Sequence, residues 1–258
     1  MFSYPWRLLI QLSAREMRAK LSYSSLGVIW LVLTPLALLA VYSLVFGLIF
    51  KARVPEGLEF PFVVWLAVAL WPWLAFSEAV MRAAQSIRQY GALIAKVPIE
   101  RSLFVWSVLN ATFGLHMVGY LIVLAAIQML GIDLGWLSIP HLVLILITLY
   151  LFTLGLSLLL AATQVFIRDL EQLLPILFTL WFFLTPIIYA PQLLPEEFRS
   201  FLYLNPMTWW VEEIRTALLD GQSIPDSTLL LLLGLAALAC VLGGWVFQRT
   251  SGFFEDFL

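Results

Sequence analysis

Six long apolar runs constrain this chain more than any other feature of its sequence. They cover about residues 26–50, 60–80, 103–130, 142–167, 173–189 and 228–247. A helix needs roughly 20 apolar residues to cross a bilayer, because the hydrocarbon core is about 30 Å thick. The runs therefore predict an all-α integral membrane protein with six transmembrane helices in one domain, residues 1–258. Only 12% of the residues are charged, against about 25% in soluble domains, which supports this class.

The charges between the runs predict the orientation. An even number of spans places both termini on one side, and the excess of Lys and Arg in cytoplasmic loops identifies that side. With cytoplasmic termini, ten of the fourteen basic residues fall inside. The four outside are Lys51, Arg53, Arg199 and Arg215. We therefore expect a multi-pass protein of the cytoplasmic (inner) membrane with both termini in the cytoplasm. The net charge of −2 gives no indication of a nucleic-acid partner.

The fifth run is short and an unusual connection follows it. Residues 173–189 are uncharged, and Pro186 near their end should kink or stop the helix. Residues 190–227 hold four prolines and eight charges, which makes them too polar to span. Pro195 and Asn205-Pro206 favour the starts of two short helices on the outer side.

The second of these outer helices is predicted to be amphipathic. One face would carry Trp210, Ile214 and Leu218, and another Glu213, Thr216 and Asp220. We expect this helix to rest in the outer interface as a lid or collar around an exit.

Two cytoplasmic segments also show helical patterns. Residues 1–25 place Trp6, Leu9 and Ile10 on one side and Arg7 and Arg15 on the other, at spacings of three and four. This pattern predicts an amphipathic helix lying in the membrane surface, and the simpler alternative is a solvated lead-in to the first span.

The second cytoplasmic segment is the loop between the second and third runs. Residues 86–100 are long enough for a short helix interrupted by Gly91 and terminated by Pro98. A soluble partner would have access to such a helix and could move it.

The sequence offers little support for catalysis. It has no phosphate-binding GxxxxGK[ST] motif and no Gly-Lys dipeptide. His116 and His141 are its only histidines, so no HExxH metal motif exists, and the single Cys240 excludes an intramolecular disulfide. We expect no catalytic residue, metal or cofactor in this chain.

Polar residues inside the runs have structural and functional interpretations. Glu78 and Arg82 are four residues apart, which favours a local salt bridge over a gating contact. Asn110, Thr112 and His116 favour hydrogen bonds between helices over a proton relay.

Aromatic residues concentrate in two runs. Tyr42, Phe46 and Phe50 recur every four residues, and Phe178, Trp181, Phe182 and Phe183 cluster in the fifth run. Packing explains such residues in most membrane proteins. Aromatic rings also stack on the C–H faces of sugars, so a carbohydrate conduit is the second interpretation.

Five segments, taken in order, resemble the membrane subunit of type-2 ATP-binding cassette exporters, in the branch that exports O-antigen, capsule or teichoic-acid polymers. They are SSLGVIWLVLTPLALLAVYSLVFGLIF at 24–50, LWPWLAFSEAV at 70–80, VFIRDLEQLLP at 165–175, FLTPIIY at 183–189 and LNPMTWWVEEIRTALL at 204–219. The resemblance covers nearly the whole chain. It implies a half-transporter in which two copies form a channel for a lipid-linked polysaccharide, in contact with membrane lipids. Two separate cytoplasmic ATPase subunits would bind ATP and magnesium.

The resemblance also implies roles for segments and residues. Residues 6–20 would be the interfacial helix, 86–100 the coupling-helix loop, and 194–203 and 207–219 the outer gate helices. Coupling to the ATPase would involve Arg88, Gln89, Tyr90 and Lys96. The channel would be lined by Tyr42, Phe46, Trp181, Phe182 and Phe183. The gate and interface residues would be Trp6, Arg7, Arg15, Glu78, Arg82, Trp210, Glu213 and Arg215.

Three other functions stay open on the sequence. A drug-exporter permease of the same superfamily would need a closed, drug-sized cavity. An intramembrane enzyme of lipid-linked sugar metabolism would need converging polar groups, for which the sequence offers His116, Asn110 and Glu78. An ion-coupled transporter would show inverted repeats or paired broken spans, and only one broken span is evident.

Overall fold

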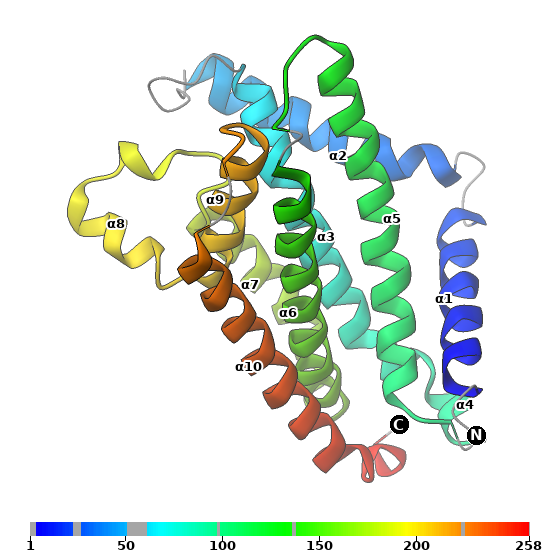
Figure 1. The fold of residues 1–258 in the computed structure, drawn as a ribbon. Coiled ribbons are helices and arrows are strands. Elements are labelled where there is room, and N and C mark those ends of the chain that lie inside the picture. The colour runs from blue at the N-terminus through cyan, green and yellow to red at the C-terminus, as the bar shows by residue number, and fades with distance from the viewer. Residues whose placement is uncertain are drawn as a thin grey trace.

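The computed structural model describes residues 4–22, 27–50, 61–96, 99–135, 138–222 and 225–257. These residues form helices joined by loops, with no strand among them (Figure 1). The longer helices are α1 (Tyr4–Ser22), α2 (Gly27–Tyr42), α3 (Phe62–Gln89), α5 (Ser102–Met129), α6 (Ile139–Phe166), α7 (Leu170–Leu184), α9 (Pro206–Leu218) and α10 (Asp226–Ser251). The shorter ones are η1 (Ser43–Ile49, a π-helix), α4 (Gly91–Ile94), η3 (Pro191–Leu193), α8 (Glu196–Leu202) and η4 (Phe254–Asp256).

Five of the described helical segments are long and apolar enough to cross a membrane. They are Val32–Ile49, which combines α2 and η1, and helices α3, α5, α6 and α10. Helix α7 has 15 residues, or about 22 Å, which is less than the thickness of a bilayer core. The expected all-helical fold is therefore confirmed. Five of the six expected runs form helices of sufficient length and apolarity to span, and the sixth forms a shorter apolar helix.

Helix α7 ends where its sequence predicts. Its last residue is Leu184, two positions before Pro186. Proline has no amide hydrogen and clashes with the preceding turn, which favours an end of the helix before Pro186, although α3 continues through Pro72. The chain then turns away into α8, and α9 returns toward the bundle (Figure 1).

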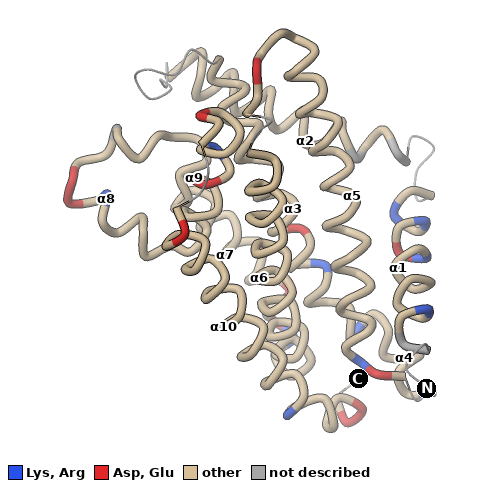
Figure 2. Tube along the Cα trace, in the orientation of Figure 1, with Lys and Arg blue, Asp and Glu red and all other residues tan. Residues whose placement is uncertain are grey.

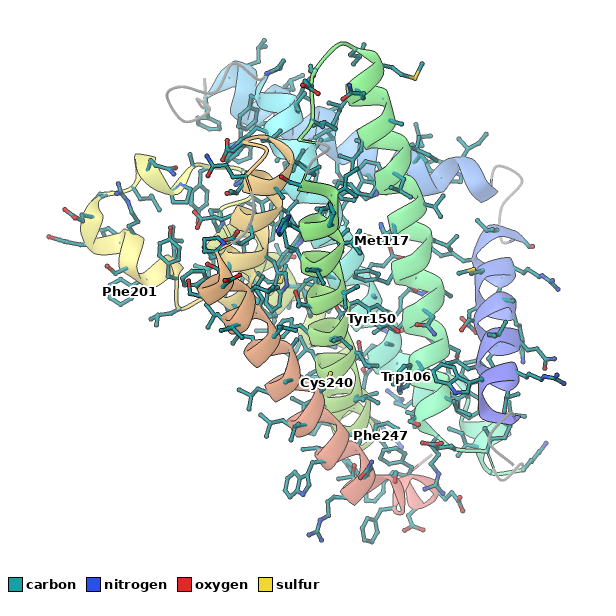
Figure 3. All side chains as sticks on the ribbon, in the orientation of Figure 1. Trp106, Met117, Tyr150, Phe201, Cys240 and Phe247 are labelled. Carbon is teal, nitrogen blue, oxygen red and sulfur yellow. The ribbon has the colours of Figure 1, made fainter. Side chains whose placement is uncertain are left out.

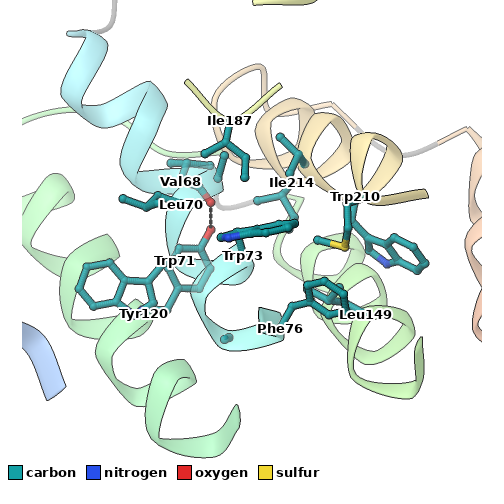
Figure 4. Close-up of a cluster of buried hydrophobic side chains, with 14 of the residues drawn as sticks. Val68, Leu70, Trp71, Trp73, Phe76, Tyr120, Leu149, Ile187, Trp210 and Ile214 are labelled. Carbon is teal, nitrogen blue, oxygen red and sulfur yellow. Dashed lines mark hydrogen bonds between the residues drawn. The ribbon is translucent and has the colours of Figure 1, made fainter. Parts of the chain in front are cut away.

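Helix α3 is the centre of the bundle. In its most apolar window 83% of the residues are buried, compared with 11% for Val32–Ile49 and 17% for α10. Trp71 and Phe76 are fully buried in this core (Figure 4), Trp71 against α5 and Phe76 against Phe152 of α6 and the α7 aromatic rings. The Tyr120 hydroxyl donates to the Val68 carbonyl at 2.9 Å, and Trp71 Nε1 donates to the His116 carbonyl at 3.1 Å. These bonds satisfy polar atoms that burial would otherwise leave unpaired.

Helices α6 and α10 make the closest backbone contact in the described fold. A Cβ atom added to Gly155 would overlap the carbonyl group of Ala239, and one added to Gly243 would overlap the Gly155 oxygen. Small residues four positions apart permit such close approach between membrane helices. This contact joins α10 to the bundle although most of its surface is exposed.

Helix α1 is present as predicted, but its placement differs from the expectation. Figure 1 shows α1 beside the lower part of α5 and following its direction, whereas a helix lying in the membrane surface would cross α5. Leu9 and Leu12 are buried, while Trp6 and Ile10 are more than 60% exposed. Packing against α5 and an ion pair to α3, described below, hold α1 in this position.

Both described chain ends lie at the same end of the bundle (Figure 1), here called the termini end. An even number of crossings requires this arrangement. Helices α5 and α6 carry no Lys, Arg, Asp or Glu along their length, whereas α3 holds Glu78 and Arg82 within it (Figure 2).

Candidate functional site

Glu78 connects three helices inside the bundle. Its Oε1 atom lies 2.6 Å from Lys20 Nζ of α1, and its Oε2 atom lies 2.7 Å from His116 Nε2 of α5. Arg82 lies farther away, at 3.7 Å. The expected local pair with Arg82 is thus the longest of the three contacts of Glu78. Helix α1 packs against α5 and places Lys20 closer to Glu78 than Arg82 is. The expected role of His116 as an interhelical hydrogen-bonding residue is confirmed.

The loop after α3 is tied to both neighbouring elements. Arg88 Nη1 lies 3.3 Å from Glu171 Oε2 in the first turn of α7. The Tyr90 hydroxyl donates to the Glu16 carboxylate of α1, and the Tyr90 ring stacks on Phe104 at 4.8 Å. Burial, and next the hydrogen bond to Glu16, raise the pKa of Tyr90 to about 12. The hydroxyl therefore keeps its proton at neutral pH and remains a donor.

These contacts change the interpretation of the expected coupling residues. Arg88 and Tyr90 contact α7 and α1 of their own chain, and Gln89 bonds to Gln85 at 3.2 Å within α3. Lys96 is exposed, as expected of a residue that meets a partner. Helix α4 begins at Gly91, where an interruption was predicted, and Pro98 lies outside the described residues. A role in ATPase docking stays a prediction.

The aromatic residues expected to line a channel lie together at the junction of α2, η1 and α7. Tyr42 stacks on Phe182 at 5.3 Å, and Phe46 lies 6.3 Å from Tyr42. Phe183 is 48% exposed, but Phe182 is only 5% exposed. Phe182 therefore packs inside the chain, because Tyr42 and the α3 residue Trp73 cover it.

Trp73 is an aromatic residue that sequence reasoning missed. Its ring lies 6.1 Å from Trp181, 5.8 Å from Phe182 and 6.3 Å from Phe178. In the sequence, Trp73 stands in the segment LWPWLAF, and its apolar neighbours give no indication that it packs against the aromatic residues of α7. Trp73 joins the α7 aromatic cluster to the centre of the bundle.

Asn205 links the end of α7 to the start of α9. Its Oδ1 atom accepts the Met207 amide at 3.0 Å, which confirms the predicted helix cap, and also accepts Trp181 Nε1 at 2.7 Å. Its Nδ2 atom donates to Thr185 Oγ1 at 2.9 Å and to the Leu184 carbonyl at 3.2 Å. One amide therefore ends α7, begins α9 and fixes the Trp181 ring.

Arg215 is buried, with 7% of its surface exposed. Its guanidinium donates to the carbonyls of Pro186 at 2.6 Å and Ile187 at 2.8 Å, and Nε lies 3.4 Å from the Trp65 carbonyl. Its Cζ atom lies 3.3 Å from the centre of the Trp65 ring, within the range of a cation–π interaction. Arg215 thus fastens α9 to α3 and to the turn after α7.

Helix α9 packs directly against the bundle, and its expected role as a lid or collar stays a prediction. Trp210, Ile214 and Leu218 are buried, as their spacing predicted, but against α3 and α6. Trp210 Nε1 donates to Thr148 Oγ1 of α6 at 3.0 Å, and the Gly135 amide donates to the Leu218 carbonyl at 2.8 Å. Apolar burial and these bonds make α9 part of the bundle. Glu213 of the same helix is half-buried.

Helix α8 is the exposed part of the outer segment. Phe198 is 60% exposed, Phe201 68% and Leu204, just after the helix, 78%. Figures 1 and 3 show α8 projecting from the bundle with Phe201 at its outer side. Trp6 and Arg7 of α1 are likewise exposed, and Arg15 lies 5.9 Å from the Tyr90 ring.

Together these features define a polytopic helical membrane protein whose described residues contain no cluster of metal-ligating side chains. The chain belongs to the ABC-2 type transporter family, whose family model matches residues 7–219. The resemblance noted in the sequence is thereby confirmed.

Curated relatives of this chain include O-antigen export permeases and a polysialic acid transport protein. The chain is 33% identical over 245 residues to the O-antigen export system permease protein RfbA of Myxococcus xanthus, covering 93% of this chain and 90% of that protein. It is 27% identical over 222 residues to the Klebsiella pneumoniae RfbA, covering 84% and 82%. It is 25% identical over 237 residues to the polysialic acid transport protein KpsM of Escherichia coli, covering 92% of this chain and 90% of that protein.

Proposed function

We propose that this chain is the permease subunit of an exporter that moves a lipid-linked polysaccharide out across the cytoplasmic membrane. The similarity to O-antigen export permeases over nearly the full length of both chains carries this proposal. Two copies of the chain form the channel, and a separate ATPase subunit on each copy binds ATP and magnesium. The chain supplies passage and gating and no bond chemistry.

Exposed aromatic and apolar surface supports a channel between two copies. The segment Val32–Ile49 is only 11% buried within the single chain, and α7 exposes Leu180, Phe183 and Leu184. Tyr42, Phe46 and Trp181 are half-buried beside them. A second copy facing α2 and α7 would place these rings along the contact between the chains.

The contacts of the loop after α3 support a coupling mechanism. Movement of α4 by an ATPase subunit would act on α1 through Tyr90 and on α7 through Arg88, because those side chains contact Glu16 and Glu171. Of the two described outer helices, α8 is the more exposed, whereas α9 is fastened by Arg215 and Trp210. We therefore assign the gate to α8 and a supporting role to α9.

Co-purification tests the proposal. The chain is isolated from its native membrane in a mild detergent, and the complex is weighed and assayed for ATP hydrolysis. Two copies of the chain with two ATPase subunits, together with export of polymer by reconstituted vesicles, are expected. A stable assembly that lacks an ATPase, after detergent stripping has been checked by cross-linking in the membrane, contradicts the exporter.

The competing functions predict other results. A drug exporter would transport small apolar compounds and leave the polymer inside. An enzyme would use the polar groups within the bundle, but Glu78 and His116 contact each other and Lys20, while Asn110 accepts the Tyr150 hydroxyl. The polar side chains named for an enzyme therefore pair with other side chains of the bundle, and the cluster around Glu78 contains no nucleophile.

A further inference from the structure

A polar cleft of about 460 Å³ opens at the termini end between α3, α6 and α7. Its lining includes Gln85, Arg88, Gln164, Arg168, Glu171 and Phe257. Amides, guanidinium groups, a carboxylate and a phenyl ring thus surround one space.

Gln164 is the most informative residue of the cleft. Its side chain has no exposed surface, yet neither its Oε1 nor its Nε2 atom has a hydrogen-bond partner among the described residues. A buried amide without partners is costly and uncommon in folded proteins. A ligand in the cleft with a donor and an acceptor side by side would satisfy both atoms once the Gln164 side chain turns into the opening.

The other groups narrow the chemistry of that ligand. Arg88 and Glu171 lie 3.3 Å apart and largely neutralise each other. Arg168 forms no ion pair with any carboxylate in the described ranges, so one positive charge remains. Adjacent hydroxyl groups provide a donor and an acceptor at the spacing of an amide, and the half-exposed Phe257 ring offers a face for C–H groups.

We propose that this cleft binds one sugar unit of the exported polymer at its cytoplasmic entrance. The proposal rests on the proposed function and adds a recognition site to it. Glu171 at the cleft and Trp181 in the aromatic cluster belong to the same helix and are about 15 Å apart along its axis. A sugar unit held at Gln164 would thus lie at the start of the helix that carries the conduit residues.

Binding of oligosaccharides to purified protein tests the site. The probes are fragments of two to five sugars prepared from the surface polysaccharide of the source cells, titrated into the protein in lipid nanodiscs without ATPase. Gln164→Leu should raise the dissociation constant by about ten-fold or more, as expected for loss of one to two hydrogen bonds. Arg168→Gln should weaken acidic fragments more than neutral ones.

A stability measurement separates recognition from a structural role. Because Gln164→Leu removes two unpaired buried polar atoms, it should leave the melting temperature unchanged or higher while binding is lost. Gln172→Leu is the matched control, since Gln172 is exposed on α7 outside the cleft. It should change neither binding nor melting.

Three outcomes overturn the proposal. The first is that the oligosaccharides do not bind saturably to the wild-type protein. The second is that the wild type and both cleft variants bind them equally, and the third is that Gln164→Leu lowers the melting temperature. Loss of ATPase association with sugar binding intact would instead identify the cleft as a docking surface. Export by the wild-type complex is measured in parallel, so failure of the exporter function is distinguished from failure of this site.

Discussion

Replacing Arg215 by methionine should destabilise the protein by removing the fastening of α9. The guanidinium makes two short bonds to buried carbonyls, at 2.6 and 2.8 Å, and a longer one at 3.4 Å. Hydrogen bonds from a charged donor contribute about 1.5–3 kcal/mol each. Burying the cation offsets part of this gain, because no carboxylate of the described residues lies within 4 Å of it. We expect a net loss of about 3 kcal/mol.

Thermal unfolding in detergent, followed by tryptophan fluorescence, measures this loss. For a chain of this size 1 kcal/mol corresponds to about 2–4 °C, so Arg215→Met should melt about 6–12 °C lower. The melting temperature of Arg215→Lys should lie between those of the wild type and Arg215→Met, since one ammonium group cannot replace all the hydrogen bonds of the guanidinium. Arg7→Met, on the exposed face of α1, is the control. A shift below about 2 °C for Arg215→Met would refute the reasoning.

Further predictions concern packing, coupling and orientation. Gly155→Val should prevent the α6–α10 contact and abolish folded yield, whereas Gly234→Val, with open space around it, should express normally in a size-exclusion assay. Arg88→Glu should reduce transport-coupled ATP hydrolysis, and adding Glu171→Arg should restore it, because the ion pair is re-formed with reversed charge. If the double variant stays as inactive as Arg88→Glu, the ion pair does not couple α3 to α7. Asp220→Cys, exposed after α9, should react with an impermeant thiol reagent added to intact cells, and labelling only in broken cells would reverse the topology.

The sequence predicted elements better than contacts. The end of α7 before Pro186, the Asn205 cap and the buried face of α9 followed from local rules of proline, capping and periodicity. Periodicity identifies a buried face but does not say what covers it. The packing of α9 on α3 and α6 was therefore not predicted, because these partners are distant in sequence.

The same reason explains the missed contacts of the charged residues. Lys20 and Glu78 are 58 positions apart, and Arg215 and the Trp65 carbonyl are 150 apart. A rule based on spacing finds Arg82, one turn away, and assigns Glu78 to it. A cation whose partners are backbone carbonyls leaves no signal in the sequence, since every residue has a carbonyl.

Two side-chain contacts at the end of α3 differ in strength: Arg88–Glu171, which binds α7, and Tyr90–Glu16, which binds α1. The weaker contact would break first. The pair Arg88–Glu171 is partly exposed, so it is worth about 1 kcal/mol or less and weakens as salt increases. The Tyr90–Glu16 bond is supported by stacking on Phe104 and persists at any physiological pH. A pull on α4 would therefore separate α7 first while α1 stays attached, and the chain would open on one side only.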